Sequence, residues 1–404
     1  MPDVELRKIL RLASARSLNT FGRIVLNTTV GWELYARTHN TLVLSAIGLV
    51  LVVPVVLLFV PAGGLVDRSD RRALATLAVT TTGFVGVGLA LISAFDAPLP
   101  LFFAMLLVQG CANAIHAPAG GSLLPLIIAR DQLTRANRIC SSWQELAAII
   151  GPLCAGLALD LVPVAWIYGA IGLTGVTAGA LYRSLPRPRA VEVPVDNARK
   201  DWRAGLRFIF RSPLLLPALT LDMFAVLFAG VPVLLPAVAL HLGLDGFHFG
   251  LLRAAQSAGA VSMAVLGGRL APWRRPGRVL LIVVALFGLA TMGFGLSTWF
   301  PLSLVLLYLC GALDNISVVI RLTLEQLVVP DQIRGRVSAV HFVFIGMSNE
   351  LGGAESGAAA YLLGTMPSIV AGGAVAVIVV GLIAVRWRAL ARMPPLAELQ
   401  PAAL

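Results

Sequence analysis

The stretch GGLVDRSDRR, residues 63–72, places five charged side chains in the six positions from Asp67 to Arg72, between two long apolar runs. The chain around it is 58% hydrophobic and only 13% charged, and its mean hydropathy is +0.88. Apolar runs of about 20 residues recur along the chain, and that length crosses a hydrocarbon core about 30 Å thick. The sequence therefore predicts an integral membrane protein in which residues 63–72 connect two spans.

Twelve spans can be placed along the chain from these apolar runs. They should be helices, because backbone groups in lipid must pair internally and the continuous runs do not alternate as barrel strands do. The first span is the weakest by hydropathy, since Asn19, Arg23 and Asn27 interrupt it. The predicted spans are 12–36, 41–62, 73–94, 99–128, 138–160, 163–183, 213–241, 247–268, 278–297, 300–328, 335–362 and 366–387.

The distribution of arginine predicts the orientation of these spans. Positive residues gather on alternate connections, including Arg68, Arg71 and Arg72, whereas the other connections carry almost none. Cytoplasmic connections hold the excess of positive charge, so both termini should be cytoplasmic. This topology, together with anionic headgroups, accounts for the net charge of +11. We expect the lipid bilayer, and no nucleic acid, as the partner of these charges.

An internal repeat divides the chain. LIIARDQLTRANR at 126–138 matches LVVPDQIRGRV at 327–337, and the opening stretch has a weaker counterpart in GGRLAPWRR at 267–275. Both pairs lie about 200 residues apart, which predicts two halves of six spans with the same orientation, an architecture found in transporters. The predicted organisation is an N-terminal half at 1–183, a cytoplasmic linker at 184–212 and a C-terminal half at 213–404.

The charged stretch between the second and third spans resembles the cytoplasmic signature loop of the major facilitator superfamily. The resemblance covers nearly the whole chain and is sharpest toward a branch of exporters similar to the enterobactin exporter. The stretches that carry it are WELYARTHN (32–40), LPLIIARDQLTRAN (124–137), GP (151–152), WRAGLRFIFRSP (202–213), LDNISVVIRLTLEQL (313–327), RGRV (334–337) and SNELGG (348–353). It implies the twelve-helix fold of that superfamily, and it does not identify the substrate.

The resemblance also implies a role for the opening stretch. In the family this loop holds the inner ends of the two halves together when the cavity faces outward. Its residues here are Gly63, Asp67, Arg68, Arg71 and Arg72. Asp67 is expected to accept hydrogen bonds from a helix N-terminus and from arginines. The alternative is a solvated turn that only enforces topology. We call the loop in the first of these roles the cytoplasmic latch. Its counterpart GGRLAPWRR has Ala271 in place of Asp67, so it lacks the carboxylate of the first latch.

Ionisable residues inside the spans are costly in hydrocarbon and therefore mark functional positions or partners. On the tenth span Asp314, Arg321 and Glu325 share one helical face, and Arg321 can pair with Glu325 one turn later. Polar stripes also occur on the eleventh span, where Glu350 lies on a different face, and on the fourth. These stripes are His341, Ser348 and Glu355, and Gln109, Asn113 and His116.

Helices one, four, seven and ten line the central cavity in the superfamily. The resemblance therefore implies that the cavity wall includes Arg23, Asn27, Asn113, His116, Asp222 and Asp314. Arg23 is expected to clamp a substrate or carboxylate, because a guanidinium cannot lose its proton. Asp222 could serve the cavity or a helix-packing ion pair, and Arg321 with Glu325 is expected to be structural. Glu350 and Glu355 could have structural, gating or proton-coupling roles.

The energy source follows by elimination. The sequence contains no GxxxxGK[ST] phosphate loop, no HExxH and no GxSxG, so ATP hydrolysis, metal chemistry and nucleophilic catalysis have no support and we expect no enzyme. A secondary transporter driven by the proton gradient, without a cofactor, remains. Its proton carrier must be a carboxylate that alternates between partners. Asp222, Asp314 and Glu145 are the candidates.

The sequence thus predicts a proton-coupled exporter of a small amphiphilic or anionic molecule, siderophore-like or drug-like, working by alternating access. Export is implied by the resemblance to the exporter branch. An uptake transporter or lipid flippase of the same fold is an alternative, and a non-transporting receptor or scaffold is an alternative from another class. We expect a monomer with a small-molecule substrate, spanning a bacterial inner membrane many times.

Overall fold

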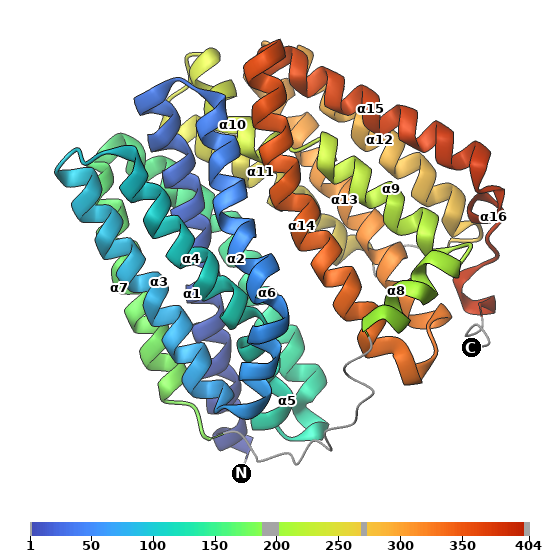
Figure 1. Cartoon of the computed structure of the whole chain (residues 1–404), viewed down its shortest axis with the longest axis horizontal. Helices are drawn as coiled ribbons and strands as arrows, with labels where there is room; N and C mark the ends of the chain where they lie inside the picture. Colours follow the sequence, from blue (N-terminus) through green and yellow to red (C-terminus); the bar gives the residue numbers. More distant parts are fainter. Residues whose placement is uncertain (1, 188–201, 268–272, 400–404) are drawn as a thin grey trace. The chain divides into compact units, whose positions relative to one another are not determined.

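The computed structural model describes residues 2–187, 202–267 and 273–399 (Figure 1). Within these ranges the chain is helical and has no β-strand, which confirms the predicted all-α class. The helices of the first part of the chain are α1 (Pro2–Thr38), α2 (Thr41–Arg68), α3 (Arg71–Ala94), α4 (Leu99–Gly121), α5 (Leu123–Ile127), η1 (Arg130–Gln132), α6 (Leu133–Leu161) and α7 (Val164–Arg183).

The later part of the chain begins with a short amphipathic helix. Residues 188–201 of the predicted linker lie outside the described residues, and so does Ala271. The helices of this part are α8 (Trp202–Arg211), α9 (Leu215–Phe228), α10 (Val231–His241), α11 (Gly246–Gly267), α12 (Pro276–Leu296), α13 (Phe300–Val328), α14 (Asp331–Leu363), α15 (Thr365–Arg386), α16 (Arg388–Ala391) and η3 (Leu396–Glu398).

The helices pack into two units. The first contains α1 to α7 and also residues 239–254, which include the end of α10 and the beginning of α11. The second contains α8, α9, most of α10, and the helices from residue 255 onward. Two helices, α10 and α11, therefore contribute residues to both units.

Ten segments of the described chain are long and apolar enough to cross a membrane. They occupy the positions of ten predicted spans. The first and eleventh predicted spans correspond to α1 and α14, which are also long helices. Their hydropathy is reduced by polar residues such as Asn19 and Arg23 on α1 and Glu350 and Glu355 on α14. The twelve-span prediction is thus consistent with the helices observed.

Large apolar side chains cover the outer faces of these helices. Leu57 is 69% exposed, Phe84 67% and Leu173 69%. Soluble monomers rarely expose extensive apolar patches, because apolar surface in water is unfavourable. A hydrocarbon environment removes this cost, so these side chains are suited to contact with lipid.

Glycine residues bring α3 and α7 together in the first unit. A Cβ atom at Gly86 would meet backbone atoms of Gly172, and one at Gly175 would meet backbone atoms of Gly83. Apolar association is weak between helices in lipid, so close backbone packing at small residues stabilises the pair instead. We call the contact formed by Gly83, Gly86, Gly172 and Gly175 the first glycine seam.

The second unit repeats this arrangement between α12 and α15. A Cβ atom at Gly288 would meet the carbonyl oxygen of Gly373, and one at Gly373 would meet that of Gly288. We call this contact the second glycine seam. A further close approach joins α11 and α13, where Gly259 lies against the backbone of Tyr308 and Gly311 against that of Gln256. Small residues therefore set helix spacing in both units.

The seventh predicted span is not one continuous helix. The helix α9 ends at Phe228 and α10 begins at Val231, with Ala229 and Gly230 between them. Gly230 packs against α14 so closely that a Cβ atom there would meet the Ser356 hydroxyl and the backbone of Gly352. Pro232 follows at the beginning of α10, a position where its missing N–H is tolerated. The apolar run is uninterrupted in sequence, so hydropathy does not reveal the break.

Two buried tyrosines on α7 lie in different apolar clusters of the first unit. Tyr182 belongs to a cluster of apolar side chains that includes Leu12, and Tyr168 to a second cluster that includes Leu26. Both rings are completely buried. Their hydroxyl groups must find hydrogen-bond partners inside the unit, and these partners are functional candidates.

Candidate functional site

A buried ion pair joins two helices of the second unit. Asp222 on α9 binds Arg321 on α13, and the two side chains are 11% and 3% exposed. Arg321 Nε also donates to the carbonyl oxygen of Ser317 at 3.3 Å. A guanidinium remains charged, so its burial requires an acidic partner. The predicted pair of Arg321 with Glu325 is therefore wrong, and Asp222 forms the helix-packing pair that was one of its two alternatives.

Glu325 has partners on α14 instead. Its Oε2 atom contacts Nδ1 of His341, and its Oε1 atom accepts from the Ser338 hydroxyl. Glu325 and His341 are 4% and 3% exposed. The stripe predicted on α14 is thus partly buried: Ser348 is buried as well, whereas Glu355 is half-buried and lies beside Ser356. Contacts with α14 therefore hold the Glu325 carboxylate in place, and the residue pattern of α13 alone could not predict them.

The other acidic candidates lie in less enclosed positions. Asp314 is half-buried on α13, and so is Glu350 on α14. Glu145 on α6 is exposed on its own unit. Asn315, next to Asp314, has a buried Oδ1 atom without a hydrogen-bond partner among the described residues. This part of α13 therefore combines a carboxylate with an unsatisfied amide oxygen.

Polar candidates on α4 form two small networks in the first unit. Gln109 Nε2 donates to Asn113 Oδ1 at 2.9 Å and to the Thr82 hydroxyl at 3.2 Å. The imidazole of His116 lies 3.3 Å from the hydroxyl oxygen of Tyr182 and 3.5 Å from Asn19 Nδ2, both measured from Nε2. The stripe predicted on this helix is therefore hydrogen-bonded to α3, α7 and α1.

Arg23 and Asn27 lie on the middle part of α1. The Arg23 side chain is exposed on the unit, and that of Asn27 is half-buried. Neither is enclosed in the way that Arg321 is. An arginine that is accessible on its own unit, within a predicted span, can reach an anionic group that approaches the helix.

The carboxylate that caps α3 is Asp70. Its Oδ1 atom accepts from the backbone N–H groups of Arg72 at 2.8 Å and Ala73 at 3.3 Å. Asp70 therefore caps α3, and the role expected of Asp67 stays a prediction, because the Asp67 side chain lies outside the described residues. A carboxylate at this position satisfies N–H groups that have no partner in the first turn of the helix.

The remaining residues of the predicted latch are described in part. Arg72 Nη1 donates to the carbonyl oxygens of Leu185 at 2.7 Å and Arg183 at 3.4 Å, which ties the beginning of α3 to the end of α7. Arg68 is exposed and Arg71 half-buried. The side chain of Asp67 and the burial of Gly63 lie outside what the structure describes. Arg72 therefore has an observed role within the first unit.

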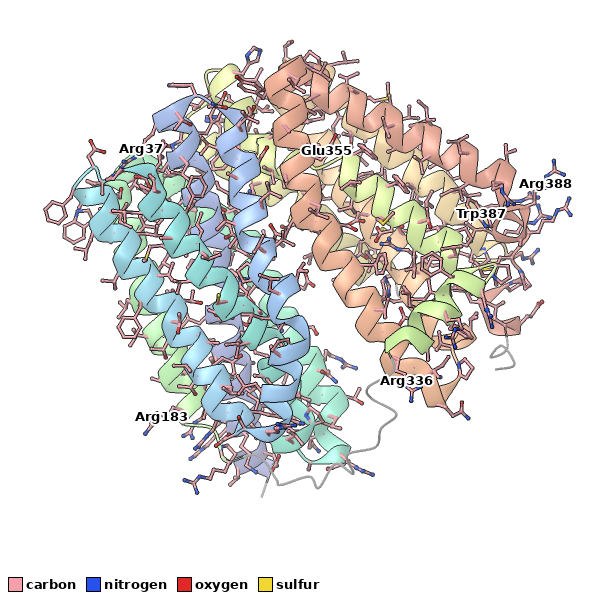
Figure 2. All side chains as sticks on the ribbon, in the orientation of Figure 1. Arg37, Arg183, Arg336, Glu355, Trp387 and Arg388 are labelled. Carbon is pink, nitrogen blue, oxygen red and sulfur yellow. The ribbon has the colours of Figure 1, made fainter. Side chains whose placement is uncertain are left out.

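A network around Glu33 was missed by the sequence analysis. This carboxylate, 6% exposed, accepts from the Tyr168 hydroxyl at 2.7 Å, from Arg37 Nη2 at 2.7 Å and from the Ser93 hydroxyl at 2.6 Å. Arg37 also pairs with Asp96 at 3.0 Å. In Figure 2, Arg37 and Arg183 lie at opposite ends of the first unit. The signal available in sequence was the four-residue spacing of Glu33 and Arg37 on one helix.

Asp160 is a second residue that the sequence analysis did not select. Both of its carboxylate oxygens accept backbone N–H groups at the beginning of α11, from Gly246 and Phe247 at 2.8 Å each. Gly156 packs against Gly246 and Gly250 beside it. The end of α6 and the beginning of α11 are thus joined within the first unit.

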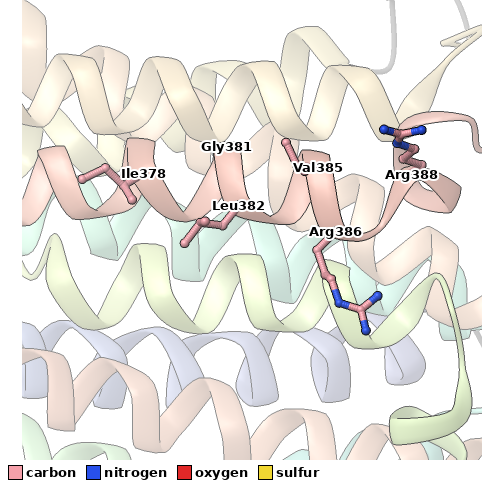
Figure 3. Close-up of a pocket in the computed structure, with 6 residues that line it drawn as sticks. All are labelled: Ile378, Gly381, Leu382, Val385, Arg386 and Arg388. Atoms are coloured by element: carbon pink, nitrogen blue, oxygen red, sulfur yellow. The ribbon is translucent and has the colours of Figure 1, made fainter.

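One shallow groove lies on the surface of the second unit. It follows α15 and reaches α16, as Figure 3 shows. The groove is lined by Ile378, Gly381, Leu382, Val385, Arg386 and Arg388. None of the predicted site residues belongs to it, so this groove is separate from the buried charges.

Comparisons with known proteins agree on the family. The model of the Major Facilitator Superfamily matches residues 12–353. The Enterobactin exporter EntS of Citrobacter koseri is 30% identical over 331 residues, which cover 81% of this chain and 79% of the relative. The protein of the same name from Escherichia coli O1:K1 matches with the same identity and coverage.

Solved structures show the same fold at low identity. A bacterial homologue of the human lysosomal transporter Spinster, inward-facing and unoccupied, aligns with a TM-score of 0.75 and 15% identity over 96% of this chain and 98% of that one. A variant of the nucleoside transporter NupG aligns with a TM-score of 0.76 and 11% identity over 94% and 99% of the two chains.

Proposed function

Because the chain belongs to the major facilitator superfamily, we propose that it is a proton-driven exporter of small amphiphilic or anionic molecules. It is a multi-pass membrane transporter and not an enzyme. We add to this family assignment a direction of transport, an energy source and a substrate class. The observation that supports them most is the similarity to enterobactin exporters over 81% of the chain.

The proposed substrate class rests on the exporter relatives and on Arg23. EntS is named for enterobactin, so a siderophore-like substrate is the first candidate. Arg23 adds a permanent positive charge on α1 that is accessible on its own unit. Such a charge favours molecules with an anionic or strongly polar group. Drug-like amphiphiles of the same character are included in the proposal.

The proposed energy source is the proton gradient, with no cofactor. Support comes from ionisable residues inside the second unit, such as Asp314, which is half-buried, and Glu325, which is buried. Buried ionisable residues in membrane helices commonly belong to ion or proton pathways. The coupled transport would follow alternating access in a bacterial inner membrane, with both termini in the cytoplasm and the monomer as the working unit.

Transport into inverted membrane vesicles tests this proposal. The panel contains enterobactin and labelled anionic and cationic dyes, with and without an imposed proton gradient. We expect gradient-dependent accumulation of enterobactin or of one dye class, abolished by a protonophore and absent from vesicles without the protein. If correctly folded protein accumulates none of these compounds, or accumulates them only in right-side-out vesicles, the proposal of export is overturned.

A further inference from the structure

Glu325 on α13 and His341 on α14 form a buried side-chain contact between the two helices. Both carboxylate oxygens of Glu325 are engaged, one by the Ser338 hydroxyl and the other by the imidazole of His341. An ionised carboxylate only accepts hydrogen bonds, so Nδ1 of the imidazole must carry a hydrogen in that state. The tautomer of His341 is therefore determined by its neighbour.

In the part of the chain that the structure describes, the second nitrogen of His341 has no such neighbour. Its Nε2 atom is buried and has no hydrogen-bond partner among the described residues. With the hydrogen on Nδ1, the neutral ring presents a lone pair at Nε2. A buried polar atom without a partner costs free energy, and sites where it persists call for an explanation. A position that takes up a proton during the working cycle is such an explanation.

The charges nearest to this contact are already balanced. Asp222 and Arg321 neutralise each other, so the net charge of the group depends on the imidazole alone. With neutral His341 the contact carries one negative charge, from Glu325, and with a proton on Nε2 it carries none. A buried net charge is unfavourable, and the proton on Nε2 removes it.

Other ionisable groups lie on the elements that pack against α13 and α14. Arg334 donates to the carbonyl oxygens of Gln326 and Val329 at the turn between the two helices. The side chain of Arg203 on α8 lies outside the described residues. Exposed or half-buried groups are Arg207 and Arg211 on α8, His248 and Arg253 on α11, Arg278 on α12, Asp314 on α13, Arg336, Glu350 and Glu355 on α14, Arg386 on α15 and Glu398 on η3.

We propose that Nε2 of His341, held in place by Glu325, takes up and releases the proton that drives transport. This inference rests on the proposed proton-driven export. Histidine exchanges protons in the pH range of cells, which suits a group that must both bind and release them. The proton adds to the Nε2 lone pair from water on one side and returns to water on the other, while the hydrogen on Nδ1 stays with Glu325.

The proposal changes which residues carry the chemistry. Asp222 is committed to Arg321, so protonating it would leave a buried guanidinium without its partner. Protonating His341 breaks no ion pair and removes a net charge. Glu325 and Ser338 then act as positioning residues, because they orient the ring without exchanging the coupled proton.

Proton binding can be measured without a substrate. The chain has five histidines, so the imidazole signals of purified protein carrying isotope-labelled histidine can be resolved by nuclear magnetic resonance in lipid nanodiscs. We expect the His341 signal to change from neutral to protonated between about pH 8 and pH 5. Its assignment follows from His341→Gln or, if that variant does not fold, from single glutamine variants of the other four. A ring that keeps one protonation state over this range overturns the inference.

Coupling is tested in inverted vesicles with enterobactin as the probe. We expect His341→Gln to lose gradient-driven accumulation while still letting enterobactin equilibrate down its own concentration gradient. His241→Gln is the matched control, because His241 is exposed at the end of α10 and takes no part in this contact, so we expect it to keep gradient-driven accumulation. Gradient-driven accumulation by His341→Gln at the wild-type level overturns the inference. If the wild type itself ignores the gradient, proton-driven export fails, and the magnetic resonance titration alone decides whether His341 binds a proton.

Discussion

Asp222 on α9 pairs with Arg321 on α13. Glu325, one turn later on the same helix, contacts His341 instead of Arg321. Two charges that are distant in sequence thus neutralise each other inside the second unit. The pair also connects α9, the first part of the broken span, to the continuous helix α13.

Removing one member of this pair should destabilise the protein strongly. Asp222→Asn leaves the Arg321 guanidinium buried without a counter-charge, and we expect the free energy of unfolding to fall by about 3–5 kcal/mol. Thermal unfolding in detergent measures the change. The double variant Asp222→Asn with Arg321→Gln should recover much of the loss, because no charge is left buried. A double variant less stable than the single one would contradict the pairing.

Arg23 should act on binding and not on folding. Its side chain is exposed on the first unit, so Arg23→Ala removes little buried surface. We expect loss of enterobactin or anionic dye binding to purified protein, with an unchanged unfolding temperature. Arg23→Lys, which keeps the charge and loses the planar fork, should bind with intermediate affinity. Full binding by the alanine variant would remove Arg23 from the substrate site.

The hydrogen bonds and ion pairs around Glu33 should contribute unequally to the free energy of unfolding. Tyr168→Phe removes a buried hydrogen bond to a charged group, and we expect a loss of about 1.5–3 kcal/mol in unfolding free energy. Asp96 is 90% exposed, so Asp96→Asn breaks a surface pair with Arg37 and should cost at most about 1 kcal/mol. Chemical unfolding of the two variants compares them directly. Equal losses would show that the Glu33 carboxylate is not the centre of the network.

The first glycine seam should tolerate no added methyl group. Gly175→Ala places a Cβ atom against the backbone of Gly83, and overpacking of this kind costs about 1–3 kcal/mol. Gly169 is a control on the same helix, since a Cβ atom there meets nothing within 4 Å. Gly169→Ala should be neutral or slightly stabilising in a thermal unfolding assay. A neutral result for Gly175→Ala would mean that α3 and α7 are not held at the distance seen here.

Asp160 should anchor the beginning of α11. Asp160→Ala leaves two backbone N–H groups of that helix without acceptors, and we expect a loss of about 0.5–2 kcal/mol. Asp160→Asn retains one accepting oxygen and should lose less. Hydrogen exchange at Gly246 and Phe247 is the local measurement, with faster exchange expected in the alanine variant. Unchanged exchange at both amides would exclude the cap.

The sequence predicted the spans well because a hydrocarbon solvent imposes long apolar runs. It failed at Ala229 and Gly230, where the interruption consists of small apolar residues that hydropathy counts as part of a span. The cause of the break is packing: Gly230 approaches the backbone of Gly352. Contacts of this kind depend on a helix more than a hundred positions away, and no local pattern reports them.

The buried charges were found from the sequence, but their partners were not. Arg321 and Glu325 have the spacing of a one-turn pair, and both are better satisfied by neighbours on other helices. Periodicity ranks residues on one helix only, whereas the choice of partner depends on which faces meet. Glu33 illustrates the same limit, since two of its hydrogen-bond donors, Ser93 and Tyr168, come from other helices.

The two glycine seams also bear on the ancestry of the chain. Gly83 in one unit corresponds to Gly288 in the other, and Gly172 corresponds to Gly373; each residue lies about 200 positions from its counterpart. This spacing is expected if a gene encoding a single half was once duplicated. The ionisable residues do not follow this copy: Glu33 has its network in one unit, and Asp222 with Arg321 occur in the other. The close glycine packing therefore occurs in both halves, whereas each of these two charged contacts belongs to one half.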